Sequence, residues 1–419
     1  MNQLPYIYTF RKVLPCFLLL FVVFCLNACS ISKIKEQIKV AEDIGAVKGK
    51  VNVENNQKGT VFVAILQQTG NTLTVRNRLM ASAEGDYIFH VPPGDYLVGA
   101  FIDSNNDAVY TTGEHASFYG DPTKISVKPA QIVYLDAITI SNKPLVLPEN
   151  VTVEVDRRKI LENIGRVVNL DDPMFNEEHY STGLWEWVDF LQDVGGGLFL
   201  LEEYNKDKIP VLLIHGIGGG PHNWDKVIEG LDKDRFQPWV LYYPSGVRLD
   251  IVSDYVLRAI TDLQKEHKFK QLYVVAHSMG GLVMRSFVKK YQEKHPEQFK
   301  SLKFAMTINS PMQGMASAEW GLSVGFLIIP SWRDVASNST FIQDLHAWSW
   351  PKDIPYILAF SYKTGKSEDG VVTLQSQIPQ NLQFEATKLY GFNASHGGVL
   401  SDGEFLARFK DIMSDSITR

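Results

Sequence analysis

Cysteine is scarce in this chain of 419 residues, and its three cysteines all lie near the start, at positions 16, 25 and 29. No cysteine follows Cys29. The fold beyond that position therefore cannot depend on a disulfide framework, and a buried apolar core has to hold it together.

A hydrophobic run long enough to cross a membrane is also missing at the N-terminus. The apolar run of residues 13–26 is 14 residues long, whereas a transmembrane helix needs about 20. It follows Arg11 and Lys12. A short apolar run behind basic residues is typical of a secretory signal, which is removed from the mature protein.

The apolar run ends in Leu26-Asn27-Ala28-Cys29, and Ser30 comes next. This stretch resembles the lipobox of bacterial lipoproteins. The resemblance implies that residues 1–28 are a signal peptide and that a lipidated Cys29 anchors the chain to a membrane. An ordinary cleaved signal and an uncleaved anchor are the alternatives. Serine rather than aspartate at position 30 implies, by the same resemblance, the outer membrane of a bacterial cell envelope.

An excess of positive charge is absent too, because the formal net charge is −6. A nucleic-acid-binding surface is therefore not indicated. With 45% hydrophobic and 21% charged residues, the composition is that of an ordinary globular protein. The length favours two domains.

The first domain is predicted after a polar tether at residues 29–45. Residues 46–142 contain short β-rich runs separated by clusters of glycine, proline, asparagine and aspartate. This spacing predicts an antiparallel β-sandwich. The turn Val91-Pro92-Pro93-Gly94-Asp95-Tyr96 resembles the Pro-Gly hairpin of carboxypeptidase-regulatory-like and transthyretin-like sandwiches.

A loop inside the predicted sandwich has the spacing of a calcium site. Asp103, Asn105, Asp107 and Glu114 stand at places 1, 3, 5 and 12 of a calcium-binding loop, where oxygen ligands are expected. Ala108 replaces the glycine that makes the sharp turn. A structural Ca²⁺ and a plain polar hairpin loop both remain open.

The second domain is predicted for residues 206–419, after a linker and entry segment at residues 143–205. In this domain, strand-like runs such as IPVLLIHG, QLYVVAHS and IPYILAFSY alternate with amphipathic helical segments. The alternation predicts a mostly parallel sheet with helices on both faces. Reactive residues then gather where the strands end.

The stretch Ala276-His277-Ser278-Met279-Gly280-Gly281 lies at such a strand end and is followed by a helical pattern. A serine on a sharp strand-to-helix turn presents its hydroxyl above the sheet, provided that its neighbours are small. The usual motif is G-x-S-x-G, and Ala276 replaces its first glycine. Ser278 is the predicted nucleophile.

The stretch His215-Gly216-Ile217-Gly218-Gly219-Gly220 follows an earlier strand. Backbone N–H groups in such a loop can stabilise the oxyanion that forms during attack on a carbonyl group. We expect Ile217 and Met279 to supply them. A phosphate loop is the alternative, but neither its glycine spacing nor its lysine is present. His215 is interpreted as a structural hydrogen-bonding residue.

The general base is predicted by elimination. The turn at Ser278 resembles the nucleophile turn of the α/β-hydrolases, in which the acid and then the histidine follow the serine along the chain. Only His295, His346 and His396 follow Ser278. His295 lies in a polar helix end that we expect to face solvent, and His346 lies in an apolar stretch. His396 directly follows the last strand-like run and is therefore the predicted base.

The acid is predicted at Asp369, which follows the strand-like run IPYILAFSY by one loop. Its carboxylate would orient the histidine and stabilise the imidazolium form. The neighbouring Glu368 is its competitor. Residues 206–419 resemble the α/β-hydrolase superfamily, in particular bacterial lipases and related lipid esterases.

The resemblance implies a membrane-anchored serine hydrolase, a lipase or carboxylesterase, that needs no metal or organic cofactor for catalysis. Its partners would be a lipid or acyl-ester substrate and the membrane. A thioesterase, an amidase or an acyltransferase could use the same residues, and a non-catalytic surface lipoprotein is the alternative outside enzymes. The apolar segment of residues 311–339 is either a lid that gates a lipid substrate or a packed core helix.

Overall fold

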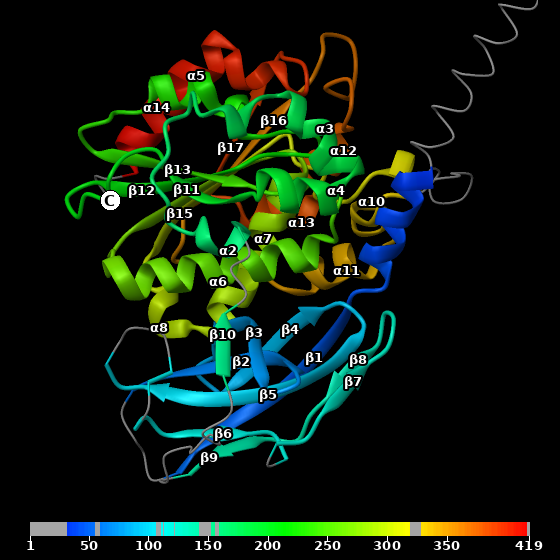
Figure 1. Cartoon of the computed structure of the whole chain (residues 1–419). Coiled ribbons are helices and arrows are strands. Elements are labelled where there is room, and N and C mark those ends of the chain that lie inside the picture. The colour runs from blue at the N-terminus through cyan, green and yellow to red at the C-terminus, as the bar shows by residue number, and fades with distance from the viewer. Residues whose placement is uncertain are drawn as a thin grey trace, which may run out of the picture.

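The computed structural model divides the chain into an N-terminal β region and a C-terminal α/β region (Figure 1). The predicted signal peptide and Cys29 lie outside the described residues. No helix among the described residues has the length and apolar character needed to cross a bilayer. The structure describes residues 32–54, 59–105, 110–111, 113–120, 122–141, 152–155, 159–318 and 328–416.

Two sheets form the β region. One sheet has the order β4-β1-β8, with β9 paired to β1, and its strands are β1 (Gly45–Val53), β4 (Asp86–Val91), β8 (Ile132–Tyr134) and β9 (Ile138–Ile140). The other has the order β10-β3-β2-β5-β6, with β7 paired to β5. Its strands are β2 (Thr60–Thr69), β3 (Thr72–Met80), β5 (Gly94–Asp103), β6 (Ala116–Phe118), β7 (Ile125–Val127) and β10 (Thr152–Val155).

The two sheets share one apolar core, as expected for a sandwich. Alternate residues of β4 are buried, and Phe89 packs in a cluster with Val47 of its own sheet and with Val63 and Val98 of the other. The pairing is not wholly antiparallel, because β1 pairs in parallel with β8 and β9, and β10 pairs in parallel with β3. β10 lies within the predicted linker.

The predicted Pro-Gly hairpin at residues 91–96 is wrong. β4 pairs with β1 and β5 pairs with β2, so the chain passes from one sheet to the other between them. Pro92 and Pro93 have no N–H group to donate to a continuing ladder. The crossing is held instead by the Tyr96 hydroxyl, which donates to the Pro92 carbonyl at 2.8 Å.

The α/β region is built on one sheet of seven strands in the order β11-β13-β12-β14-β15-β16-β17. All neighbouring pairs are parallel except β11 with β13. The predicted mostly parallel sheet is therefore confirmed. Its strands are β11 (Gly197–Leu200), β12 (Ile209–Ile214), β13 (Phe236–Tyr242), β14 (Leu272–His277), β15 (Leu302–Ile308), β16 (Tyr356–Ser361) and β17 (Lys388–Phe392). β11 lies within the predicted linker.

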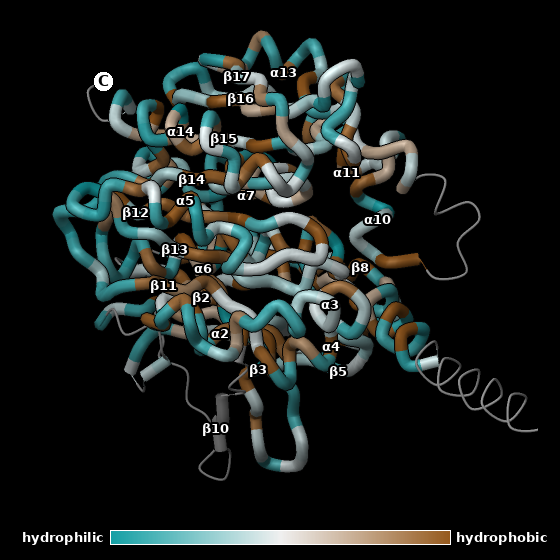
Figure 2. Tube along the Cα trace, turned by 90° about the horizontal axis from the view of Figure 1, so that it is seen from above, coloured by the Kyte–Doolittle hydropathy of each residue, from teal (hydrophilic) through white to brown (hydrophobic). Residues whose placement is uncertain are grey.

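Helices cover both faces of this sheet, which explains why its central strands are apolar without alternation. Leu212 and Val274 pack in one core cluster with α6 and α7. Their neighbours Val211 and Val275 pack in a second cluster with α5 and α14. Figure 2 shows the hydrophobic residues concentrated along β11, β12 and β13. These helices are α5 (Asp225–Gly230), α6 (Leu249–His267), α7 (Met279–Lys294) and α14 (Gly403–Asp415).

Shorter helices lie between the strands and around the sheet. They are α2 (Lys159–Glu162), α3 (Glu178–Trp185), α4 (Trp187–Asp189), α8 (Pro296–Phe299), α10 (Pro330–Val335), α11 (Thr340–Ala347), α12 (Leu374–Gln377) and α13 (Gln380–Glu385). Short 3₁₀ or π turns occur at Pro173–Phe175, Phe190–Val194, Pro221–Trp224 and Gly398–Ser401.

Residues 32–42, within the predicted tether, form a helix. We call it the N-terminal helix, and Figure 1 shows it in blue beside α10. Its Ala41 is buried in the core cluster of the α/β region. The segment is therefore packed against the distant α/β region, although the β region separates the two in sequence.

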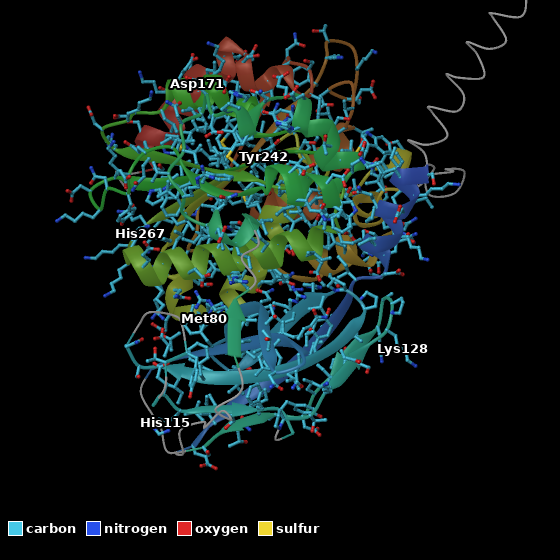
Figure 3. The ribbon with its side chains drawn as sticks, in the orientation of Figure 1. Met80, His115, Lys128, Asp171, Tyr242 and His267 are labelled. Atoms are coloured by element: carbon cyan, nitrogen blue, oxygen red, sulfur yellow. The ribbon has the colours of Figure 1, made fainter. Side chains whose placement is uncertain are left out.

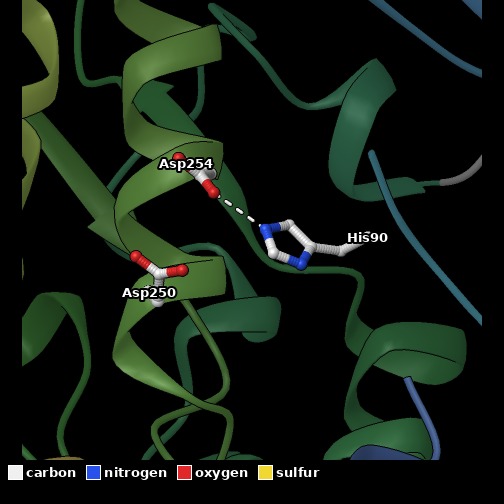
Figure 4. A group of neighbouring side chains, drawn as sticks. All are labelled: His90, Asp250 and Asp254. Carbon is white, nitrogen blue, oxygen red and sulfur yellow. Dashed lines mark hydrogen bonds and ion pairs between the residues drawn. The ribbon is translucent and has the colours of Figure 1, made fainter. Parts of the chain in front are cut away.

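Helix α6 makes several polar contacts between the two regions. Arg258 donates to Asn77, Lys265 pairs with Asp103, and His90 bonds to Asp254 at 2.8 Å (Figure 4). Figure 3 places Met80 where the two regions meet and Tyr242 inside the α/β region.

Candidate active site

Ser278 stands at a sharp bend between β14 and α7. Its φ of 55° and ψ of −131° lie outside the regions that L-residues favour, and such strain is typical of functional sites. A side chain at Gly280 could not fit, because its Cβ would lie 2.4 Å from the Ile214 carbonyl oxygen. Ala276 is fully buried within β14, so the methyl group that replaces the usual glycine is accommodated.

Three predicted site residues come together at the carboxyl ends of the strands. His396 Nε2 lies 2.8 Å from Ser278 Oγ, and His396 Nδ1 lies 2.7 Å from Asp369 Oδ2. Asp369, and not the neighbouring Glu368, bonds to the imidazole. The geometry is that of a nucleophile, a base and an orienting acid.

The environment of Asp369 keeps its carboxylate ionised. Burial by itself raises the pKa of this group. The hydrogen bonds from His396 and from the N–H groups of Val371 and Val372 outweigh burial, so the pKa lies below its ordinary value. A charged Asp369 favours the tautomer with the proton on Nδ1, which leaves Nε2 free to accept the serine proton.

The other two histidines that follow Ser278 in the sequence have different surroundings. His295 is buried rather than solvent-facing, and burial lowers its pKa to about 4. The expected exposure of His295 is therefore wrong. His346 bonds to the Met312 carbonyl at 2.9 Å and to Asn381 at 2.7 Å. Neither histidine bonds to Ser278 among the described hydrogen bonds.

The loop after β12 lies against Ser278. The space above Gly216 is filled by the serine, since a Cβ there would lie 2.7 Å from Ser278 Cβ. Gly218 N–H donates to Ser245 Oγ at 2.9 Å, which fixes the loop. Among the hydrogen bonds of the described residues, none uses the N–H of Ile217 or of Met279 as donor. Both donors are therefore available to a ligand.

His215 is fully buried beneath this loop. Its Nδ1 donates to the Gly216 carbonyl at 2.8 Å, and its ring stacks on Tyr243 with centroids 4.3 Å apart. Burial lowers the pKa of His215 to about 4, so the ring is neutral at physiological pH. These contacts are those of a structural histidine.

Sequence reasoning missed two side chains that hold His396 in place. The backbone carbonyl of His396 accepts one hydrogen bond from His277 Nε2 at 2.9 Å and another from Asn309 Nδ2 at 3.0 Å. Both donors come from the ends of neighbouring strands, β14 and β15. Burial, together with the nearby His396, lowers the pKa of His277 to about 3, so His277 stays neutral. Only their positions at strand ends could have indicated this role.

A cavity of about 600 Å³ opens beside Ser278 and His396. Both predicted N–H donors, Ile217 and Met279, belong to its wall. The wall is mainly apolar, which suits an acyl group. Its apolar residues are Ile217, Met279, Pro311, Met315, Ala318, Trp332, Val335, Val371 and Leu400.

The predicted lid segment, residues 311–339, is described only in part. Residues 319–327, including Trp320 and Phe326, lie outside the described residues. The described flanks reach the cavity, with Ala318 before the gap and Trp332 of α10 after it. Ile329 is buried. The choice between lid and core helix stays open.

The predicted calcium loop joins the antiparallel strands β5 and β6. Glu114 accepts hydrogen bonds from Ser104 N, Ser104 Oγ and Thr111 N at 2.8–3.0 Å, and Asp103 pairs with Lys265. Asn105 is exposed, and Asp107 lies outside the described residues. The carboxylates of Asp103 and Glu114 are thus engaged by protein donors and lend the calcium interpretation no support. It stays a prediction.

Another acidic group lies between the two regions. Oxygen and nitrogen atoms of His90, Asp250 and Asp254 lie within 4.8 Å of one another (Figure 4). Lys290 Nζ lies 2.6 Å from Asp250 and 2.8 Å from Asp254, so an ammonium group already neutralises these carboxylates. Burial by itself raises the pKa of Asp254. Lys290 and His90 lower it by more than burial raises it, so the pKa of Asp254 lies below its ordinary value. The group is an ion-pair network between the regions.

Residues 209–350 match the family model of the alpha/beta hydrolase fold. No curated protein matches the chain. Among solved structures, the chain is similar to the mature Bacillus licheniformis lipase BlEst2, with 15% identity, a TM-score of 0.40 and coverage of 51% of this chain and 94% of that one. It is also similar to Aspergillus fumigatus lipase B, with 20% identity, a TM-score of 0.40 and coverage of 52% and 55%. A third similar structure is Est1E from Butyrivibrio proteoclasticus, with 15% identity, a TM-score of 0.38 and coverage of 51% and 90%.

Proposed function

We propose that this chain, whose C-terminal region has the α/β-hydrolase fold, is a membrane-anchored serine hydrolase of carboxylic esters, with lipid or other acyl esters as substrates. The observation that carries the proposal is the continuous hydrogen-bonded path from Ser278 Oγ through His396 to Asp369. The apolar cavity beside Ser278 supports an acyl substrate.

In the proposed reaction, Ser278 Oγ attacks the ester carbonyl carbon while His396 Nε2 accepts the hydroxyl proton. The imidazolium that results is stabilised by the buried, ionised Asp369. His396 then gives its proton to the leaving alkoxide, and the acyl group remains on Ser278. Water, deprotonated by His396, releases the carboxylic acid and restores the serine.

The N–H groups of Ile217 and Met279 are the proposed oxyanion donors. Both are free of protein acceptors among the described residues. Both belong to the cavity wall beside Ser278. A preorganised donor of this kind is worth about 10²–10³ in rate.

The membrane anchor is proposed at Cys29, on the resemblance of residues 26–29 to a lipobox. Several acyl chains on one cysteine anchor a protein firmly, whereas a single chain binds only marginally. Expression with labelled palmitate tests this step. The chain should incorporate the label, and Cys29→Ala should not.

A fluorophosphonate probe tests the catalytic proposal directly, because it reacts with activated serines. The folded protein should carry one adduct on Ser278, and Ser278→Ala should carry none. Ser126→Ala, in the β region, is the matched control and should label like the parent. Absence of an adduct from the folded parent would refute the proposal.

A series of p-nitrophenyl esters of rising chain length tests the ester preference. The apolar cavity predicts a rise in kcat/KM from acetate toward longer acyl chains. A thioesterase or an amidase would instead favour a thioester or an anilide of the same acyl group. Faster turnover of either would overturn the ester assignment while leaving the nucleophile in place.

A further inference from the structure

The N-terminal helix is fastened to the α/β region at both of its ends. Near its start, Lys33 Nζ lies 2.5 Å from Glu186 Oε2 and 2.5 Å from Asp189 Oδ2, at α4. Near its end, Glu42 Oε1 lies 2.5 Å from Arg333 Nη2 of α10. These pairs are partly exposed, and such ion pairs contribute little to stability by themselves. They do fix where the two ends of the helix lie.

Buried contacts in the middle of the helix hold it more firmly. Gln37 is 6% exposed. Its Oε1 accepts from Val188 N–H and its Nε2 donates to Asp189, each at 2.8 Å. Its backbone carbonyl accepts from Trp187 Nε1 at 3.0 Å. A buried amide with both ends satisfied sets one register and orientation of the helix.

The places where the helix is fastened adjoin the wall of the cavity. Arg333 follows Trp332, which lines the cavity. Trp185 precedes Glu186, and its ring packs edge-on against Trp332 with centroids 6.3 Å apart. Figure 1 shows the N-terminal helix beside α10. The start of the described chain is thus fixed close to the cavity that contains Ser278.

The proposed anchor can lie only a short distance from this point. Cys29 precedes Ser32 by three residues. Three residues span at most about 11 Å even when fully extended. If Cys29 carries the acyl chains, the membrane surface is therefore held close to the N-terminal helix, and with it close to α10.

The cavity itself presents apolar side chains to its surroundings. Ile217 is 41% exposed and Val371 is 54% exposed, and both line the cavity, on the loops after β12 and after Asp369. Large apolar side chains exposed together at a cavity commonly mark a contact surface. A lipid bilayer within reach of the anchor is an occupant of matching chemistry.

We propose that the N-terminal helix fixes the orientation of the α/β region on the membrane that holds Cys29, with the cavity toward the bilayer, so that Ser278 hydrolyses acyl esters of that same membrane. This inference rests on the proposed esterase activity and on the proposed anchor. It adds the source of the substrate and gives the helix a defined role as a strut.

The test lengthens the chain between the proposed anchor, Cys29, and the N-terminal helix. A Gly/Ser insertion of 20 residues between Ile31 and Ser32 has an end-to-end distance of about 25 Å. The full lipidated chain is placed in phosphatidylethanolamine–phosphatidylglycerol vesicles that contain a fluorogenic diacylglycerol ester. The same insertion between Gly70 and Asn71 is the matched control, because a side chain at Gly70 would meet no atom within 4 Å.

The insertion after Ile31 should lower the rate on the ester in the same vesicle by about five- to tenfold, because the effective concentration of substrate at the cavity falls. The insertion after Gly70 should leave this rate unchanged. Both variants should keep the parental rate on soluble p-nitrophenyl butyrate. Substrate in separate vesicles should be cleaved far more slowly than substrate in the anchoring vesicle.

An unchanged same-vesicle rate after the insertion at Ile31 would overturn the orientation. Equal rates on substrate in the same and in separate vesicles would overturn it as well. Failure of the proposed function looks different, since the parent would then cleave neither ester and would form no fluorophosphonate adduct. Failure of the anchor would show as a Cys29→Ala variant that stays bound to membranes like the parent.

Discussion

The β region and the α/β region differ in how they use their polar residues. In the β region, Asp103 and His90 are used to contact α6 of the other region. In the α/β region, polar residues gather at the ends of parallel strands, where Ser278, Asp369 and His396 meet. The α/β region therefore contains the candidate active site. The β region has its own apolar core and is joined to the α/β region by polar contacts.

The two regions can also be followed separately in experiments. All eight tryptophans of the chain lie beyond residue 184, in the α/β region or its entry segment. Tryptophan fluorescence therefore reports on the α/β region alone. The unfolding of the α/β region can therefore be measured separately from that of the β region.

The largest expected effect is on activity and is confined to the α/β region. Ser278→Ala should lower kcat on p-nitrophenyl butyrate by about 10⁵–10⁶, since the nucleophile is lost. Its thermal unfolding should remain close to that of the parent. The same substitution at Ser126, in the β region, should leave kcat unchanged. A comparable loss of kcat in Ser126→Ala would show that activity is not confined to the α/β region.

The next effect is on stability and should be confined to the β region. Phe89 is fully buried in the shared core of the two β sheets. Phe89→Ala should lower the free energy of unfolding of this region by about 3–5 kcal/mol. Circular dichroism should show earlier loss of the β signal, while tryptophan fluorescence and labelling of Ser278 persist. Simultaneous loss of all three signals would mean that the regions fold as one unit.

Acid should act on the α/β region through its buried histidines. Burial lowers the pKa of His215 and His295 to about 4 and that of His277 to about 3, below the ordinary value of 6.5. The unfolded chain therefore binds protons below pH 6.5 that the folded chain does not, and stability falls as the pH decreases. From pH 6.5 to 5.5 each histidine should remove about 1 kcal/mol.

This loss is measured by urea unfolding, followed by tryptophan fluorescence, at each pH. His295→Gln removes one of these groups and should reduce the loss of stability between pH 6.5 and 5.5 by about 1 kcal/mol. An α/β region that becomes more stable between pH 6.5 and 5.5 would contradict the expected sign.

The smallest effect tests how His396 is positioned. Asn309→Ala removes one of the two side-chain donors to the His396 carbonyl. The expected loss in kcat is about tenfold, the equivalent of one hydrogen bond of about 1.4 kcal/mol. KM should stay unchanged, because Asn309 does not line the cavity.

Asn309→Asp is the control for this variant, because it keeps the shape of the side chain but removes the donor. Asn309→Ala should lose about this factor in kcat and Asn309→Asp at least as much, because a buried carboxylate would repel the His396 carbonyl oxygen. A change in KM alone, or a loss of thermal stability with kcat intact, would show that Asn309 serves only the fold.

Much of the fold was predictable from the sequence, because its signal is local. The strands β12 to β17 each correspond to an apolar run, and helical periodicity lies between several of them. The crossing at Pro92 was not predictable in the same way. A Pro-Gly turn looks alike whether the strands on either side pair with each other or with different sheets.

The candidate site was also partly predictable. Chain order and strand ends pointed to Ser278, Asp369 and His396, which the structure brings together. The burial of His295 was not predictable, since its neighbours in the sequence are polar and the covering residues come from elsewhere.

The sequence by itself determined the alternation of strands and helices, the small residues around Ser278 and the apolar character of the segments near the cavity. These features depend on neighbours within a few positions. Only the tertiary structure decided that Asn309 and His277 hold His396, and that Gln37 packs against residues about 150 positions away. Such contacts depend on which strand ends and helices meet in space. No pattern of neighbouring residues encodes which distant segments come into contact.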